Sequence, residues 1–295
     1  MDQGLLDPRR NAFRENLADA RLSGRVTGSS FVDGWPGQVR VAIAPVFGAP
    51  DASGALTTQL IFGERVRVFE EREGWAWLQG EADGYVGYAP AAAIGRELNV
   101  PTHRVAALAA PALARPELKS PPLVDLPMGA CLKVEREESG FAALAIGAFV
   151  PVQHLVPIDT RAADFVAVAE QFLGAPYLWG GRTRAGIDCS GLVQVAMQAT
   201  GVAAPRDSDM LLAEIGSAIA VDNGVLRRGD LVFWRGQVGI MTDAAHMLHA
   251  NAYHMRVVVE PLAEAVARIR ATGSEIIGVR RPNSPLPALA GRGLG

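Results

Sequence analysis

The first half of the chain alternates short apolar runs with polar positions, a pattern that predicts β-strands rather than helices. Between residues 36 and 98, the segments QVRVAIA and LIFGERVRVFEE are each predicted to form one strand, and GWAWLQGEADGYVGYAP two shorter ones. The turns are marked by Gly74, Gly80, Gly84 and Gly87. Short strands joined by glycine-rich turns are typical of a small barrel or sandwich. We therefore expect a first barrel over residues 36–98.

The next segment, residues 99–158, repeats this pattern at an offset of 66 residues. Turn glycines and apolar positions then coincide without a gap, which indicates a duplicated fold and a second barrel. The coinciding pairs are Val39 with Val105, Pro45 with Pro111, Gly63 with Gly129, and Gly74 with Gly140. Phe141 and Ala143 replace Trp75 and Trp77 in the second copy, so a binding role is expected on the first.

Residues 159–283 change to helical spacing followed by strands. An amphipathic stripe formed by Phe165, Val168, Ala169 and Phe172 predicts a helix, and CSGLVQVAMQATG predicts a second one. The segments GDLVFW, QVGIMTD, MLHANA and MRVVVEPL are predicted strands. Helices that precede a run of strands favour an α+β domain with an antiparallel sheet.

The two ends of the chain are expected to lie outside these three domains. Residues 1–35 are polar and read as an ordered arm packed on a neighbouring domain, with NAFRENLADARL as a short helix. Residues 284–295 are rich in Pro and Gly and are expected to form a flexible tail.

Composition narrows the class of protein. The 295 residues carry a net charge of −3, with 49% hydrophobic and 20% charged residues, which excludes wholesale disorder. Balanced charge argues against a nucleic-acid partner or an anionic membrane surface, and no apolar run approaches the ~20 residues of a membrane span. The sequence start lacks the apolar core of a signal peptide, so we expect a cytoplasmic protein with reduced thiols.

Of the two cysteines, Cys189 stands in the setting of a nucleophile. It lies between Asp188 and Ser190 at the start of a predicted helix, where the helix dipole is expected to lower the thiol pKa. A glycine-rich loop precedes it and allows close approach of a substrate. A cysteine nucleophile also needs a base and a group that orients the base.

The base is sought among five histidines. His103 and His154 fall in the second barrel and are expected to be surface or linker residues. The other three, His246, His249 and His254, follow the predicted strand QVGIM. A hairpin turning at Asp243 would place Gln237 opposite His249, Gly239 opposite Met247 and Met241 opposite Ala245. Gln237 and His249 then share one face and His246 the other, although a slip of one residue would reverse the faces.

The motifs YLWGGRTRAGIDCSGLVQ, RRGDLVFW, VGIM and LHANAYHM resemble the NlpC/P60 cysteine peptidases of bacterial cell-wall chemistry. The two preceding barrels look like bacterial SH3 domains, and the whole chain resembles the branch acting on free muropeptides, the γ-D-glutamyl-L-diamino acid endopeptidases or dipeptidyl-peptidases VI. The resemblance implies two small SH3-like β-barrels followed by an α+β, papain-like NlpC/P60 domain. It also implies no metal or other cofactor, and a muropeptide of the L-Ala-γ-D-Glu-diaminopimelate type as partner.

By the same resemblance, Cys189 is the nucleophile and His249 the polar residue that orients the base. Asp188 and Ser190 would touch substrate, and Arg206, Asp207 and Ser208 would form the loop that meets the free N-terminus of the peptide. From the first barrel, Glu64 and Tyr85 would close that end of the site, with Tyr88 as the alternative to Tyr85. A carboxylate pair, Glu64 with Asp207, is suited to hold an ammonium group.

One position departs from the family pattern. The family places its base histidine in an HVGI motif, where this chain has Gln237 in GQVGIM. An amide is not basic enough to take a proton from a thiol. Three explanations are open: His249 has become the base and Gln237 orients it, the chain binds muropeptides without cutting them, or Gln237 is a change made to trap substrate.

Two functions follow. The first is hydrolysis of the bond between γ-D-Glu and the diamino acid in short peptides with a free N-terminal L-Ala, as part of muropeptide recycling, slowed by Gln237. The alternative is a catalytically degenerate muropeptide-binding or sensing protein that uses the same pocket. A third hypothesis, which the sequence supports less, is an adaptor that binds proline-rich peptides through Trp75 and Trp77. The sequence leaves open the third substrate residue, diaminopimelate or lysine, and the oligomeric state.

Overall fold

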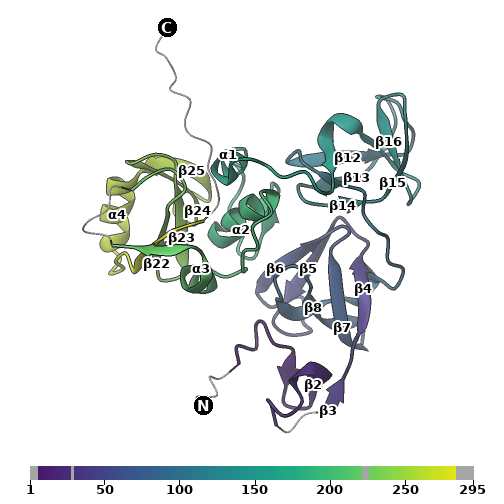
Figure 1. Cartoon of the computed structure of the whole chain (residues 1–295), viewed down its shortest axis with the longest axis horizontal. Coiled ribbons are helices and arrows are strands. Elements are labelled where there is room, and N and C mark those ends of the chain that lie inside the picture. The colour runs from purple at the N-terminus through teal and green to yellow at the C-terminus, as the bar shows by residue number, and fades with distance from the viewer. Residues whose placement is uncertain (1–5, 28–29, 221–225, 284–295) are drawn as a thin grey trace. The chain divides into compact units, whose positions relative to one another are not determined.

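The computed structural model describes residues 6–27, 30–220 and 226–283, and these form two compact units. Of the described residues, those up to 160 together with 178–186 form one unit, and 161–177 together with those from 187 onward form the other. Figure 1 shows the strands of the barrels in the first unit and the helices and sheet of the second. The flexible tail expected at residues 284–295 lies outside the described residues.

The first barrel is one seven-stranded sheet with the order β10-β4-β7-β8-β9-β5-β6. Each of the two segments expected to form one strand is divided in two, because the chain turns at residues 40–42 and again at Gly63, whose φ is +83°. Apolar residues of alternate positions fill the interior. The strands are β4 (Trp35–Val39), β5 (Ile43–Phe47), β6 (Leu56–Ile61), β7 (Arg65–Arg72), β8 (Trp75–Gly80), β9 (Val86–Pro90) and β10 (Ile94–Gly95).

The second barrel reproduces the first at the expected offset of 66 residues. β12 and β13 coincide with shifted β5 and β6, and the hairpin residues Glu73 and Ser139 both take a φ near +50°. The offset ends after β16, where the second copy is shorter. Its strands are β11 (His103–Val105), β12 (Ala109–Leu113), β13 (Pro122–Pro127), β14 (Cys131–Leu132), β15 (Val134–Glu138), β16 (Phe141–Leu144), β17 (Phe149–Pro151) and β18 (Leu155–Pro157).

The N-terminal arm packs on the first barrel, but the helix expected over NAFRENLADARL is wrong. The arm forms β1 (Phe13–Arg14), β2 (Leu17–Asp19), the 3₁₀ turn η1 (Ala20–Leu22) and β3 (Ser30–Val32). Tertiary burial overrides helix propensity here, because Leu17 packs in a cluster with Phe69 and Trp77 of the barrel.

Arg14 of the arm occupies the aromatic surface of the first barrel. Its guanidinium lies 4.6 Å from the ring centre of Trp77, donates to the Tyr88 hydroxyl at 2.7 Å and pairs with Glu70 at 2.5 Å. A proline-rich ligand would have to displace this cation. The adaptor hypothesis is therefore disfavoured.

The second unit combines four α-helices with a six-stranded sheet, among the residues described. Its order is β21-β26-β22-β23-β24-β25, and all neighbouring strands are antiparallel, as expected. Figure 1 shows α4 on one side of β22–β25 and α1 and α2 on the other. None of the described helices is long and apolar enough to span a membrane. The elements are α1 (Phe165–Glu170), α2 (Cys189–Ala199), α3 (Ser208–Glu214), β21 (Ser217–Ile219), β22 (Leu231–Trp234), β23 (Gln237–Met241), β24 (His246–Asn251), β25 (Arg256–Pro261), α4 (Leu262–Arg270) and β26 (Gly278–Arg281).

The register of the β23–β24 hairpin differs from the expected one by two residues. Met241 faces Met247, rather than Ala245, and Ile240 faces Leu248. A shift of two residues keeps every side chain on its face, since side chains alternate with a period of two. Gln237 and His249 therefore still share one face of the sheet.

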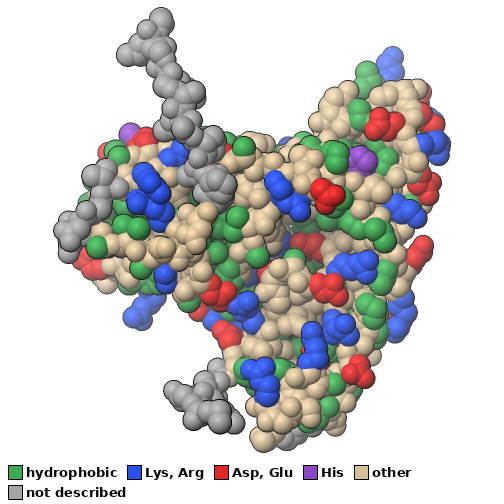
Figure 2. Space-filling model, viewed as in Figure 1, with side chains coloured by type: hydrophobic (Ala, Val, Ile, Leu, Met, Phe, Trp, Pro, Cys, Tyr) green, Lys and Arg blue, Asp and Glu red, His purple; other side chains and the backbone are tan. Residues whose placement is uncertain are grey.

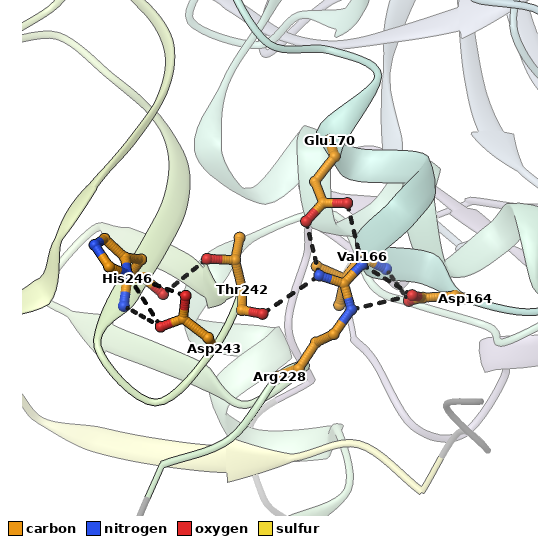
Figure 3. Close-up of polar contacts among 7 residues, drawn as sticks. All are labelled: Asp164, Val166, Glu170, Arg228, Thr242, Asp243 and His246. Carbon is orange, nitrogen blue, oxygen red and sulfur yellow. Dashed lines mark hydrogen bonds and ion pairs between the residues drawn. The ribbon is translucent and has the colours of Figure 1, made fainter. Parts of the chain in front are cut away.

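Ion pairs tie α1 to the segments beside the sheet. Arg228 pairs with Asp164 at 2.9 Å and with Glu170 at 2.7 Å, and it also donates to the Thr242 carbonyl (Figure 3). Asp164 caps the helix through the Val166 N–H at 2.8 Å.

On the surface, positive and negative side chains are interspersed on the face shown in Figure 2, as the balanced composition predicts.

Candidate active site

Cys189 is the first residue of α2, at the helix N-terminus expected from the sequence. Asp188 is the N-cap, and its carboxylate accepts the Gly191 N–H at 2.7 Å. The cap holds the start of the helix in place, and with it the cysteine. The Cys189 side chain is nearly enclosed, with 8% of the residue exposed.

The start of β23 lies against the Cys189 sulfur. Cys189 Sγ lies 3.9 Å from the Gly236 carbonyl oxygen, and the backbone N–H of Val238 hydrogen-bonds to the sulfur. Gln237 is the residue between these two contacts. The chain thus brings position 237 next to the thiol, although the two are far apart in sequence.

The pKa of the Cys189 thiol is shifted upward, whereas its place at a helix N-terminus predicted a downward shift. The pKa of Cys189 is raised to about 11, mainly by burial and also by the Asp188 carboxylate, against the lowering effects of the Val238 and Ser190 backbone and the Arg206 guanidinium. Removal from water and a neighbouring negative charge both disfavour the thiolate. The expectation of a lowered pKa is wrong because these two effects outweigh the favourable dipoles.

The Gln237 side chain forms a hydrogen bond with a buried histidine, His249. Gln237 Nε2 lies 2.9 Å from His249 Nδ1, and His249 Nε2 lies 2.6 Å from Glu260 Oε1. His249 is fully buried. Burial lowers the pKa of His249, and this effect exceeds the opposing one of Glu260. The ring is therefore neutral near pH 7.

Sequence reasoning missed Glu260 and its partner. Arg268 of α4 binds the Glu260 carboxylate in a bidentate ion pair, with both N–O distances 2.6 Å. Glu260 lies on β25, two residues beyond Val258, the direct partner of His249. The signal in the sequence was an acidic residue directly after three valines in the strand RVVVEP, and a buried acid is unusual unless its charge is paired.

Three of the predicted substrate-contacting residues form one buried network. Arg206 donates to Asp188 Oδ1 at 3.0 Å and to Oδ2 at 2.6 Å, and it also donates to the Ser190 hydroxyl at 2.9 Å. Its guanidinium side chain is only 1% exposed. In this structure the three side chains hold one another and the start of α2.

Asp207 and Ser208 lie at the beginning of α3 in the same unit. Asp207 is the N-cap residue, and its carbonyl accepts the Leu211 N–H at 2.9 Å. Both residues are partly exposed. Their predicted contact with a peptide N-terminus stays a prediction.

Glu64 of the first barrel has a buried cation as partner. Arg182 donates to Glu64 Oε1 at 3.1 Å and to the Gln59 carbonyl at 2.7 Å. Glu64 also accepts the Ile61 N–H at 2.9 Å. Glu64 and Arg182 both belong to the first unit, so the proposed pairing of Glu64 with Asp207 around an ammonium group stays a prediction.

The choice between Tyr85 and Tyr88 is narrowed by their surroundings. Tyr85 is 7% exposed, while the hydroxyl of Tyr88 accepts a hydrogen bond from Arg14.

A third tyrosine, Tyr177, was not singled out from the sequence. Burial raises the pKa of its hydroxyl to about 12, and the charges of Cys189 and Asp188 contribute to the rise. Tyr177 therefore belongs to the surroundings of the thiol, and its place in the motif YLWGG was the available signal.

Among the residues that the structure describes, no group of three or more His, Cys, Asp and Glu side chains is placed to hold a metal ion.

Comparison with known proteins agrees with this arrangement. The NlpC/P60 family model matches residues 174–274, which include the thiol, Gln237 and the whole Gln237–His249–Glu260 series. The chain carries an NlpC/P60 domain. The model described as the bacterial dipeptidyl-peptidase Sh3 domain matches residues 46–94, within the first barrel. The family resemblance and the expected fold class, SH3-like followed by α+β, are thus confirmed.

Relatives of known name extend over both parts of the chain. A gamma-D-glutamyl-L-lysine dipeptidyl-peptidase of Bacillus subtilis (strain 168) is 25% identical over 247 residues, covering 77% of this chain and 81% of the relative. Dipeptidyl-peptidase 6 of Lysinibacillus sphaericus is 26% identical over 246 residues, 75% of this chain and 90% of the relative. Both matches cover about three quarters of the chain, well beyond the residues that the NlpC/P60 family model matches.

A solved structure shares the fold. The crystal structure of an NlpC/P60 family protein from Bacillus cereus ATCC 10987 superposes with a TM-score of 0.70 at 22% identity, covering 84% of this chain and 99% of that one.

Proposed function

We propose that the chain acts on short peptides of the L-Ala-γ-D-Glu-diamino acid type in muropeptide recycling, and that its hydrolytic step is slow. The observation that carries the proposal is the Cys189 thiol at the capped start of α2, held against the backbone on either side of Gln237. The name of the Bacillus subtilis relative, a gamma-D-glutamyl-L-lysine dipeptidyl-peptidase, supports the substrate class. The cytoplasm is the setting that we propose for this reaction.

The chemistry begins with attack of the Cys189 sulfur on the γ-D-Glu carbonyl carbon. The C–N bond breaks, the diamino acid leaves as an amine that carries the proton lost by the thiol, and water then hydrolyses the thioester and restores the thiol. The Cys189 backbone N–H, at the free start of the helix, is suited to hold the developing oxyanion. Asp188, Ser190 and Arg206 keep this N-terminus in position.

Gln237 limits the first step. Its amide cannot accept the thiol proton, and the thiol pKa of about 11 leaves about one molecule in a thousand ionised at pH 8. His249 is disfavoured as a substitute base, because its two ring nitrogens face Gln237 and Glu260. Loss of a positioned base costs ~10²–10⁴-fold in rate.

The same observation favours a second candidate function, binding without turnover. A protonated thiol beside an amide preserves the shape of the site while removing its reactivity. In that case the site would still bind a peptide with a free amine, and the chain would act as a muropeptide-binding or sensing protein.

One set of variants separates the two candidates. Hydrolysis of L-Ala-γ-D-Glu-meso-diaminopimelate is followed by mass spectrometry for the chain, Gln237→His and Cys189→Ala, with the lysine-containing peptide in parallel. Calorimetry measures binding to Cys189→Ala, with N-acetylated peptide as the matched control. We expect Gln237→His to cleave ~10²–10⁴-fold faster than the chain, Cys189→Ala not to cleave, and acetylation to weaken binding.

The outcomes have distinct meanings. Slow cleavage by the chain supports the peptidase. No cleavage by the chain, with tight binding and active Gln237→His, supports the binding protein. If folded Gln237→His neither binds nor cleaves either peptide, the substrate class is wrong.

A further inference from the structure

The series of side chains behind position 237 spans three strands and a helix. It runs from Gln237 on β23 through His249 on β24 and Glu260 on β25 to Arg268 on α4, with successive distances of 2.9, 2.6 and 2.6 Å. His249 is enclosed, and the Glu260 side chain is 10% exposed. A buried charge of this kind persists only where its partners satisfy it, which points to a defined role.

We propose that Glu260 is a positioning residue: it holds the proton of the His249 ring on Nε2 and so presents Nδ1 as a hydrogen-bond acceptor to the side chain at position 237. The inference rests on the proposed function, because it concerns position 237, where this chain has Gln and the family has its base histidine. It assigns Glu260 and Arg268 to the support of that position.

The Glu260 carboxylate stays ionised, and its charge determines which atoms of the series carry protons. Arg268 donates to both oxygens of Glu260, a bidentate geometry in which the acid stays ionised. Burial by itself would raise the pKa of Glu260, but the hydrogen bonds from Arg268 and His249 hold it below its ordinary value. An ionised carboxylate can only accept, so the proton in its 2.6 Å contact with His249 belongs to Nε2.

The second ring nitrogen then has a defined role. A neutral ring with its proton on Nε2 has a bare Nδ1, and the Gln237 amide nitrogen donates to it at 2.9 Å. The Asn251 amide nitrogen lies 2.9 Å from His249 Nε2 and competes with Glu260 for that atom. The ionised acceptor at the shorter distance dominates, because charge-assisted hydrogen bonds are about twice as strong as neutral ones.

The consequence is that the site accepts an N–H donor at position 237. Gln237 meets this requirement with its amide, and a histidine there meets it with one ring N–H. The other nitrogen of that histidine is then free to take the proton of the neighbouring thiol. Loss of the carboxylate partner of a metal-bound histidine costs ~10–100-fold in activity, and by analogy we expect a similar effect here.

The first test reads the tautomer without any substrate. Long-range ¹H–¹⁵N spectra of the uniformly labelled chain report which nitrogen of His249 is protonated, with His249→Asn used for assignment. We expect the Nε2–H form in the chain and in Glu275→Gln, and a mixed or Nδ1–H form in Glu260→Gln. Glu275 is the matched control, since it pairs with Arg270 at 2.8 Å on the surface, where its side chain is 60% exposed.

The second test reads the consequence for turnover. In the Gln237→His background, Glu260→Gln is expected to lower kcat ~10–100-fold with KM changed less than about twofold, whereas Glu275→Gln leaves both unchanged. An Nδ1–H ring in the chain overturns the proposal, as does a Glu260→Gln variant that keeps both the Nε2–H form and full kcat. If Gln237→His does not cleave, the proposed function fails, while the spectra still decide the role of Glu260.

Discussion

The reactivity of the Cys189 thiol is the property that most directly tests the site. Iodoacetamide alkylates thiolates, so its rate at Cys189 as a function of pH reports ionisation without any substrate. The perturbation is Gln237→His, and the readout is the modified peptide in a mass spectrum. Cys131 serves as an internal reference, because burial and the charge of Glu64 raise its pKa to about 11 as well.

The expected alkylation rate follows from the Cys189 pKa of about 11, compared with the ordinary thiol value of 9.0. At pH 8 the thiolate fraction is about 100-fold smaller than for an ordinary thiol, since each pKa unit is a factor of ten. A more basic thiolate is more nucleophilic, with a Brønsted slope of ~0.4–0.5, which returns about tenfold. We expect alkylation about tenfold slower than that of a free thiol, before limited access is counted, and a rate that rises about tenfold per pH unit from pH 7 to 10.

The variant reverses this behaviour. An imidazole beside the sulfur stabilises the thiolate as an ion pair, so Gln237→His should react at least ~10-fold faster at pH 7 and reach a plateau near neutral pH. Cys131 should be unaffected. A plateau below pH 8 in the unaltered chain would refute the reasoning, because it would mean that the helix N-terminus outweighs burial.

Two further predictions concern the scaffold of the site, and both are measured by urea unfolding. Arg206→Met leaves the Asp188 carboxylate buried without its cation and should cost ~3–5 kcal/mol, whereas Arg270→Met, at a pair whose arginine side chain is 65% exposed, should change nothing measurable. Equal effects of the two would contradict the account of the buried network. Gly239→Ala places a Cβ 2.2 Å from the Met247 sulfur and should cost ~1–3 kcal/mol, while Gly48→Ala, with 3.8 Å of clearance, should be neutral. A neutral Gly239→Ala would show that the β23–β24 packing is looser than described.

The sequence determined the repeated barrels and the place of the candidate nucleophile, because both depend on local patterns. Turn glycines recur at a fixed offset, and their positive φ values recur with them: Gly63 and Gly129, then Gly74 and Gly140. Cys189 follows a glycine-rich loop and opens an apolar helical stripe. The shared face of Gln237 and His249 also followed, since the alternation of a strand survives a register error of two residues.

The tertiary structure decided what no local pattern contains. The arm forms strands instead of a helix because Leu17 is buried against Trp77 of the barrel. The thiol pKa rises, where a helix terminus alone predicted a fall, because the fold removes Cys189 from water beside Asp188. Glu260 reaches His249 only through the register of β24 and β25, and Arg268 reaches Glu260 only where α4 packs. Solvation and charge pairing depend on which distant segments meet, and the chain fixes that only when it folds.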